Sequence, residues 1–443
     1  MDFLLKNRFL GLLLLLGMSI NSSFSAESLL DIYSLSLESD PKLRQAQIAY
    51  AISLEKKRQD VSLLLPSVNI SGNTTDNSQK RSYEISLFDG EEDYNSHGYS
   101  LSIRQPLFSY ENNINLKQSD ERINQAGVEL VSASQSLIMR VSERYFDVLA
   151  AEDNLQFIAA EKQAVERQLK QAESRLNAGL AAITDVYEAR ARLDATLAQR
   201  IEAKNQFSNG LESLREITNS YHERLRPLSE SLVLVEPEPS DDEIWVALAL
   251  QGNLQIVALR HYNRVLRGEI SRQRAGHYPT LDLVATYSRS IAGGGNFGRS
   301  DSESSAIGLQ LNLPVDVGGM TRSRVREAIY QYDKNREEVD ATTRAVRSQI
   351  RKSYLGVLAS IALVQSLKRS VLSSDKALTA IEAGYNVGMR TTSDVLQATR
   401  DLYRMQRDYK RARYDYVLNG FRLKQAAGKL SLSDLKQVSL WLE

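Results

Sequence analysis

The chain repeats itself once along its length, with about 209 residues between equivalent positions. Residues 176–179 and 184–186 read LNAG and TDV, and residues 385–388 and 393–395 read YNVG and SDV. Solenoid proteins repeat units of about 20 to 50 residues, so a period this long indicates duplication of a whole large unit. A fold for this sequence must therefore contain two similar halves.

Two long tracts, 107–226 and 315–443, contain none of the eight prolines. Proline in a helix interior costs about 3 kcal/mol, so both tracts are free to be helical. We expect a helical hairpin in each, at about 109–220 and about 320–427, with a first arm of roughly 100 Å at about 1.5 Å per residue. Gly179 and Gly388 mark the turns, because glycine tolerates the left-handed conformation that ends a helix.

Apolar residues recur at alternating spacings of three and four in the last arm, which predicts a coiled-coil seam. These residues are Val395, Ala398, Leu402, Met405, Tyr409, Ala412 and Tyr416. The matching arm of the first copy has the same rhythm at Val186, Ala189, Leu193 and Thr196. The other faces are rich in charged residues and glutamine, so we expect the rods to stand in water.

Between the prolines the apolar period changes to two, which predicts four strands at about 66–76, 97–106, 279–290 and 304–314. The polar stretch Asp89–Asn95 and the glycine run Gly293–Gly295 are expected to be the exposed loops within each strand pair. Strands of about 10 residues cross a bilayer when tilted.

Strand period alone favours a soluble sandwich with one face on a core, but the predicted signal peptide and the attached helical rods favour strands in a membrane. A membrane location adds a condition, because four strands cannot close a barrel and open strand edges are excluded from lipid. Several chains would then have to pool their strands.

The N-terminal residues 1–25 are typical of a cleaved signal peptide. Lys6 and Arg8 precede an apolar run from Phe9 to Ile20, and small Ser23 and Ser25 follow at the positions expected before a cleavage site. An N-terminal membrane anchor is the other interpretation, but about 12 apolar residues fall short of the roughly 20 that a spanning helix needs. Farther along, no unbroken apolar run of 18 residues occurs, so no transmembrane helix is expected.

Composition removes several function classes. The 55 lysines and arginines balance the 55 aspartates and glutamates, so no basic field favours nucleic acid. Cysteine is absent, which excludes thiolate metal sites and a lipidated N-terminal cysteine. The four histidines have no metal-ligand spacing and no nucleophile or phosphate motif occurs, so we expect neither a metal, a cofactor nor an enzyme.

The predicted organisation is a signal peptide at 1–25, a first repeat at 26–226, a linker at 227–250, a second repeat at 251–429 and a C-terminal segment at 430–443. The linker is rich in proline and acidic residues. We expect it to pack with the C-terminal segment on the outside of the rods.

Several short motifs resemble the TolC family of outer-membrane efflux and secretion channels, over nearly the whole chain after the signal peptide. They are Asp40-Pro41-Lys42-Leu43, Leu65-Pro66, Tyr278-Pro279-Thr280-Leu281, Leu313-Pro314 with Gly318-Gly319, Ala383-Gly384-Tyr385 and Val387-Gly388. The resemblance implies an α+β membrane protein: a homotrimer whose twelve-stranded barrel, four strands from each protomer, continues into a periplasmic barrel of coiled-coil hairpins, with a small mixed equatorial region.

The resemblance also implies functional residues at the hairpin tips. Tyr385 and Arg390 would hold the duct closed by bonding Thr184 and Asp185 on neighbouring helices; we call these four the latch residues. Ordinary surface ion pairs are the other interpretation, because exposed pairs contribute only about 0 to 1 kcal/mol.

Asp394 would place one carboxylate per protomer in a ring lining the pore, where like charges favour cations. Well-known family members carry a second acid one turn later, but Gln397 stands there, which predicts weaker cation selectivity. Adaptor docking is expected on the tips at Gly179, Leu180, Val387, Gly388 and Met389.

The predicted function is an exit duct in the outer membrane of a Gram-negative cell, for efflux of small molecules, type I secretion of proteins, or both. A periplasmic adaptor and an inner-membrane pump of the multidrug or ABC type would open it. The alternative is a secreted periplasmic coiled-coil scaffold or adaptor that never inserts. The sequence does not identify the cargo.

Overall fold

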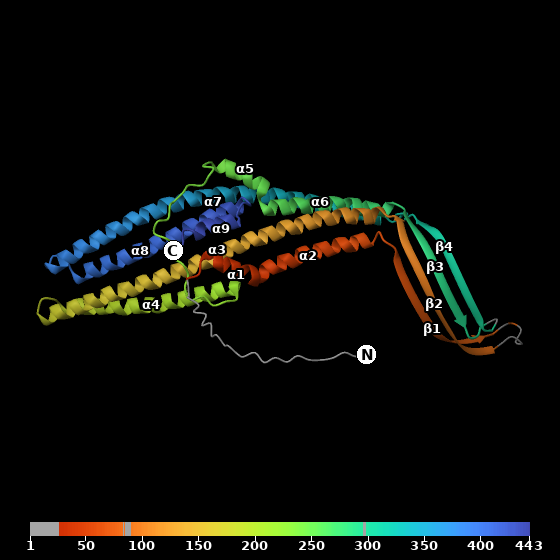
Figure 1. Cartoon of the computed structure of the whole chain (residues 1–443), viewed down its shortest axis with the longest axis horizontal. Helices are drawn as coiled ribbons and strands as arrows, with labels where there is room; N and C mark the ends of the chain where they lie inside the picture. The colour runs from red at the N-terminus through yellow and green to blue at the C-terminus, as the bar shows by residue number, and fades with distance from the viewer. Residues whose placement is uncertain (1–25, 83, 85–89, 296–297) are drawn as a thin grey trace, which may run out of the picture.

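The computed structural model describes residues 26–82, 84, 90–295 and 298–443. The molecule is elongated, with a sheet at one end and the tips of two helical hairpins at the other (Figure 1). The predicted signal peptide, including Lys6, Arg8, Ser23 and Ser25, lies outside the described residues.

Each half of the chain contains the same succession of elements. The first half has helices α1 (Leu29–Ser39) and α2 (Pro41–Ser62), strands β1 (Ser67–Arg81) and β2 (Gly90–Phe108), and helices α3 (Tyr110–Asn177) and α4 (Ile183–Thr218). The second half has α5 (Asp242–Gly252), α6 (Leu254–Arg274), the short 3-10 turn η2 (Ala275–His277), β3 (Thr280–Ala292), β4 (Ser300–Asn312), α7 (Met320–Asn386) and α8 (Thr392–Ala426). Helix α9 (Leu432–Ser439) follows.

The second copy begins earlier than the sequence suggested. Helix α5 occupies the place that α1 has in the first copy, so the expected linker end at residue 250 falls inside a helix. The error has a physical cause: α5 is a short helix that begins directly after the proline-rich stretch, where the acidic composition resembles a loop.

Side-chain caps fix several helix starts. Asp40 accepts a hydrogen bond from the backbone N–H of Leu43 at 2.8 Å, and Pro41 fills the first position of α2, where a missing N–H costs nothing. The guanidinium of Arg140 on α3 contacts both carboxylate oxygens of Asp40 at 2.8 Å and holds the pKa of that buried carboxyl below its usual range. The same pair therefore starts α2 and ties it to α3.

The four strands form one antiparallel sheet in the order β1-β2-β3-β4. The first strand pair lies where it was predicted, but both strands are longer than predicted. Residues 90–95, expected in a loop, pair with Asp76–Arg81 as the first part of β2; Asp89 lies outside the described residues. Strand pairing overrode the polar composition there. The glycine run Gly293–Gly295 does lie outside the strands.

The long helices lie side by side in one layer in the order α7, α8, α3, α4 (Figure 1). To the right of them, α6 continues the line of α8 and α2 continues the line of α4 toward the sheet (Figure 1). The predicted seam is confirmed, because its members are buried or half-buried against the neighbouring helix. Helices α4 and α7 form the two outer edges of this layer.

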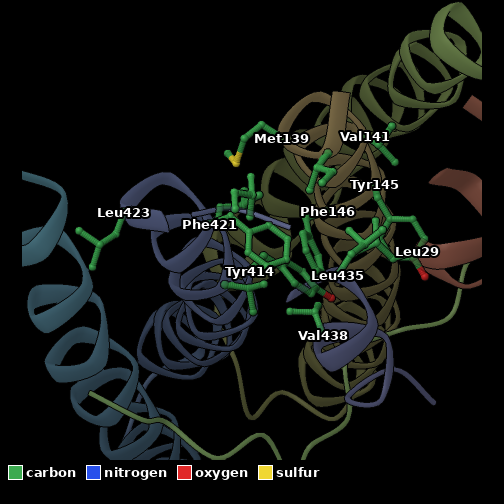
Figure 2. Packing of buried hydrophobic residues seen from close by; sticks show 14 of the residues in the cluster. Leu29, Met139, Val141, Tyr145, Phe146, Tyr414, Phe421, Leu423, Leu435 and Val438 are labelled. Atoms are coloured by element: carbon green, nitrogen blue, oxygen red, sulfur yellow. The ribbon is translucent and has the colours of Figure 1, made fainter. Parts of the chain in front are cut away.

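The main hydrophobic core lies at mid-height, where α3 and α8 meet the short elements. Phe146 stacks on Tyr414 with ring centroids 5.4 Å apart, and Leu29, Leu435 and Val438 close the cluster from α1 and α9 (Figure 2). Deletion of an aromatic side chain from such a core costs about 3 to 5 kcal/mol. This core therefore fixes the two halves to each other.

A belt of irregular chain packs against the helices at this height. The backbone N–H of Ser229 donates to the carbonyl of Trp441, and the N–H of Glu443 donates to the carbonyl of Pro227. Linker and C-terminal segment therefore pack together, as expected. Buried Arg413 on α8 donates to the carbonyls of Leu228 and Ser229, which ties the linker to α8.

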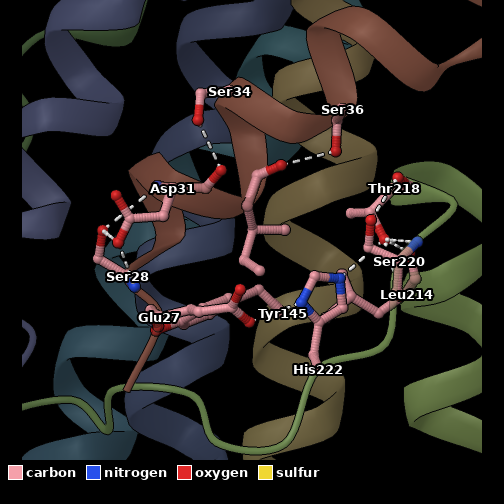
Figure 3. Close-up of polar contacts among 11 residues, drawn as sticks. Glu27, Ser28, Asp31, Ser34, Ser36, Tyr145, Leu214, Thr218, Ser220 and His222 are labelled. Atoms are coloured by element: carbon pink, nitrogen blue, oxygen red, sulfur yellow. Dashed lines mark hydrogen bonds and ion pairs between the residues drawn. The ribbon is translucent and has the colours of Figure 1, made fainter. Parts of the chain in front are cut away.

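The start of the described chain is held in the same belt. The buried imidazole of His222 lies between Glu27, with Nδ1 2.6 Å from a carboxylate oxygen, and Thr218, with Nε2 2.7 Å from the hydroxyl (Figure 3). Tyr145 donates to the backbone carbonyl of Glu27 at 3.1 Å. The chain from Ala26 onward is thus anchored among α3, α4 and the linker.

One described helix, α7, is long and apolar enough to cross a membrane by length and composition, with a window of mean hydropathy 1.4 that is 22% buried. Mean hydropathy is a looser criterion than an unbroken apolar run, which explains why the sequence analysis found none. The exposed leucines of α7, including Leu355 and Leu363, lie on an outer edge of the helix layer.

Candidate gate and channel lining

The two hairpin tips end in the same backbone turn. Gly179 and Gly388 have φ angles of 71° and 81°, the left-handed region predicted for them. The N–H of Leu180 donates to the carbonyl of Arg175, and the N–H of Met389 donates to the carbonyl of Gly384. Leu180, Val387 and Met389 are exposed at the extreme ends of the hairpins.

Tyr385 is the buried centre of the second tip. Its side chain is 5% exposed, the Arg175 guanidinium lies 4.7 Å from its ring centroid, and the Arg175 side chain donates to its backbone carbonyl at 3.1 Å. Buried Thr392 donates to the Tyr385 hydroxyl at 3.3 Å. Tyr385 therefore joins the tip of α7 to both α3 and α8.

The other latch residues are not joined within one chain. The Asp185 carboxylate accepts the N–H of Ala182 at 3.3 Å and caps its own helix. In the described part of the chain, neither Thr184 nor Asp185 bonds Tyr385 or Arg390, and Arg390 has no hydrogen bond or ion pair. Arg390 lies instead across Gly384, where an added Cβ would be 2.9 Å from the arginine Cγ.

Three contacts that the sequence analysis missed connect the hairpins near the tips. Besides the Arg175 contact, Ser393 donates to the Glu188 carboxylate at 2.6 Å, and Gln171 donates to the Asn386 side chain at 3.3 Å. A signal for the first existed in the repeat, because Arg175 stands where the second copy has Gly384. At this position the divergence between the copies marks a contact between the two hairpins.

The expected pore residues form part of a longer polar row on α8. Gln397 donates to the Asp401 carboxylate at 3.0 Å, and Asp401 lies 3.1 Å from Arg404. The spacing of Asp394, Gln397 and Asp401 places them along one helix face. A second carboxylate therefore follows Asp394 after two turns, where the sequence analysis considered only the first.

Asp394 also caps α8. Its carboxylate accepts the N–H of Thr391 at 2.9 Å, while the Thr391 hydroxyl accepts the N–H of Asp394. Hydrogen bonds from the Thr391 backbone and side chain hold the pKa of Asp394 below its usual range. The carboxylate therefore keeps its charge at neutral and mildly acidic pH.

A four-stranded sheet with two unpaired edges, joined to a layer of helices with 67- and 68-residue arms, defines a subunit of an outer-membrane duct. The family model described as "Outer membrane efflux protein" matches residues 32–220 and 245–429, one segment for each copy. The chain belongs to this family and is an outer-membrane channel of TolC type, a transport protein and not an enzyme.

Curated relatives cover nearly the whole chain. The outer membrane protein TolC of Vibrio cholerae is 34% identical over 439 residues, which is 96% of each chain. The alkaline protease secretion protein AprF of Pseudomonas aeruginosa is 29% identical over 418 residues, covering 94% of this chain and 87% of the relative.

A solved structure has the same fold. The CmeC outer membrane channel of Campylobacter jejuni superposes with a TM-score of 0.76 at 16% identity, covering 95% of this chain and 91% of that one. Channels of this family form trimers.

Proposed function

We propose that three copies of this chain form a closed duct for the export of small molecules, proteins or both, with the sheet in the outer membrane and the helices in the periplasm. The two faces of the sheet carry this proposal. One row across all four strands reads Ser71, Ser100, Ser288 and Ser304, whereas the opposite face carries Ile307, Leu309 and Leu311, all more than 60% exposed. A polar inner wall and an apolar outer wall suit a barrel in lipid.

The free edges of the chain support assembly with itself. Strands β1 and β4 each have one unpaired edge, which lipid does not tolerate. The outer helices α7 and α4 expose apolar side chains, among them Leu355, Leu363, Tyr187 and Ile201, at opposite edges of the layer. Three copies placed edge to edge would cover all of them.

The gate is proposed to lie across the boundary between copies. Helix α4, which carries Thr184 and Asp185, is at the free edge of one chain, and the tip with Arg390 is on the hairpin at the other edge. Arg390 makes no hydrogen bond or ion pair within the described part of its own chain, although its charge acts on Asp394, and it is available for Asp185 of a neighbouring copy. Weak exposed links of about 0 to 1 kcal/mol each yield to a docked partner.

Docking is proposed at the exposed tips, onto a periplasmic adaptor linked to an inner-membrane pump. Val387 and Met389 are 67% and 79% exposed beside the Tyr385 cluster. A partner that binds there acts directly on the residues that hold the tip inward. Cargo is selected by the pump, and the relative named for protease secretion makes protein cargo a member of the proposed range.

Fractionation of the native protein tests this function. A heat-resistant trimer recovered from outer membranes, beginning at Ala26 after removal of the signal peptide, is the expected result. A monomer released with the periplasm would instead support the soluble scaffold and overturn the channel.

A further inference from the structure

Two adjoining cavities form a groove between α3, α4 and α8. Their volumes are about 340 Å³ and about 430 Å³, and Asn154, Gln206 and Arg407 belong to the walls of both. The two cavities therefore adjoin each other along the junction of the two hairpins, between the tips and the mid-height core.

The basic residues that line this groove are all arginines. They are Arg144, Arg192, Arg400, Arg404, Arg407 and Arg411. A guanidinium presents its donors in a planar fork that matches carboxylate and phosphate oxygens, which a lysine ammonium does not. Six guanidiniums in one groove are suited to oxyanions.

Part of this charge is not neutralised within the chain. Arg192 pairs with Glu161 at 2.5 Å, Arg407 with Asp408 at 3.0 Å and Arg411 with Asp147 at 2.8 Å, and Arg404 lies near Asp401. Within the described residues, Arg144 and Arg400 have no ion pair, and the buried Nε of Arg192 has no acceptor.

The two copies differ in the balance of basic and acidic residues on their second hairpin arms. Helix α8 carries eight basic and four acidic residues, whereas its counterpart α4 carries five basic and six acidic ones. Four of the six groove arginines therefore come from α8 of the second copy, and Arg144 and Arg192 come from α3 and α4 of the first.

The groove opens on the side away from the linker. Arg413 contacts the linker carbonyls, and Arg404 lies nine residues, or about two and a half turns, before it on α8, so the two side chains project from opposite faces. The linker belongs outside the proposed duct, so Arg404 and the groove face its lumen. This step rests on the proposed function.

We propose that this arginine groove is an oxyanion-binding site on the luminal wall, one per chain, which takes carboxylate or phosphate groups of cargo above the acidic tip. The lumen would then be bipolar, with Asp394 at the entrance and guanidiniums farther in. Anionic groups that pass the entrance are held transiently at the wall, and salt weakens the binding by screening.

The test uses the full chain, purified from membranes, and tripolyphosphate as the probe. Calorimetry is expected to find one site per chain, and tripolyphosphate is expected to reduce the current of channels in planar bilayers. The double variant Arg144→Gln with Arg400→Gln should raise the dissociation constant and the half-blocking concentration about tenfold, which corresponds to about 1.4 kcal/mol.

The matched control is Lys410→Gln, which removes one positive charge from the same helix at a residue that pairs with Glu230 of the linker and does not line the groove. It should bind and block like the native chain. Equal weakening in control and double variant, or no binding to the native chain, overturns the groove. Binding by a chain that never conducts would instead remove the channel and keep the site.

Discussion

The two hairpin tips share a backbone and differ in their side chains. Both turn at a left-handed glycine with matching hydrogen bonds. The first tip carries Leu176, half-buried, where the second carries Tyr385, buried and bonded to Thr392. Likewise Ala181 stands opposite Arg390, and Glu188 opposite Gln397.

The shared backbone and the differing side chains of the two tips therefore have separate roles. Equal backbones give two hairpins of equal length, which a closed ring of helices requires. Unequal side chains allow one hairpin to hold the other. Arg175 on α3 contacts Tyr385 at the tip of α7, and the first tip has no tyrosine at the matching position. The following substitutions either make the second tip more like the first or test whether the two tips have different roles.

The largest effect is expected from Tyr385→Leu, which installs the residue of the first copy. It removes the Thr392 hydrogen bond and the Arg175 contact with the ring, each worth about 1 kcal/mol, and buried packing as well. Single-channel conductance should rise clearly. Leu176→Ala is the control, and an equal rise there would show that the tips do not differ in role.

A smaller rise is expected from Arg390→Ser, because exposed ion pairs are worth about 0 to 1 kcal/mol. The measurement is again conductance in planar bilayers. Arg336→Ser on the same hairpin, remote from the tip and exposed, should leave conductance unchanged. Native conductance in the Arg390 variant would remove this residue from the gate.

Selectivity should respond to charge at the entrance in both directions. Gln397→Glu adds a carboxylate beside Asp394 and should increase the preference for cations, and Asp394→Asn should decrease it. The reversal potential in a salt gradient measures both. If the two variants give the same potential as the native channel, these residues do not line the pore.

Acidification should reduce the preference for cations only at low pH. The pKa of Asp394 lies below its usual range because Thr391 stabilises the ionised form, so cation preference should persist as the pH falls through about 3.9, the ordinary aspartate value. The capping stabilisation of α8 has the same sign: it is present above the unfolded pKa and lost as pH falls through the folded one. Selectivity that is lost already near pH 5 would contradict this.

The smallest difference is expected between Gly179→Ala and Gly388→Ala. Both glycines have positive φ and no atom within 4 Å of an added Cβ, so each variant should lose about 1 to 2 kcal/mol through backbone strain alone. Limited proteolysis at the tips measures the loss. Clearly unequal rates would mean that the turns themselves are not equivalent.

Most of the fold followed from local signals. The hairpins were predicted to within a few residues, because proline-free tracts, tip glycines and a seam at three and four spacing all act within a few turns of chain. The errors fell where pairing overrode composition, at residues 90–95 of β2, and where a short helix followed a proline-rich stretch, at α5.

Only part of the candidate site could be predicted from the sequence. The resemblance gave Tyr385, Arg390, Asp185 and Asp394, but not Arg175, because its contact with Tyr385 joins residues 210 positions apart. The arginine groove was missed for the same reason, since no single stretch of sequence contains its three walls.

The sequence by itself determined the duplication, the element types and the tips, because these depend on backbone conformation and on residues close along the chain. Only the tertiary structure decided which residues of one copy meet the other: Tyr385 with Arg175, Ser393 with Glu188, and the arginines of α8 with α3 and α4. Those contacts depend on how two rods lie against each other, and a helix shifted by one turn would change every one of them.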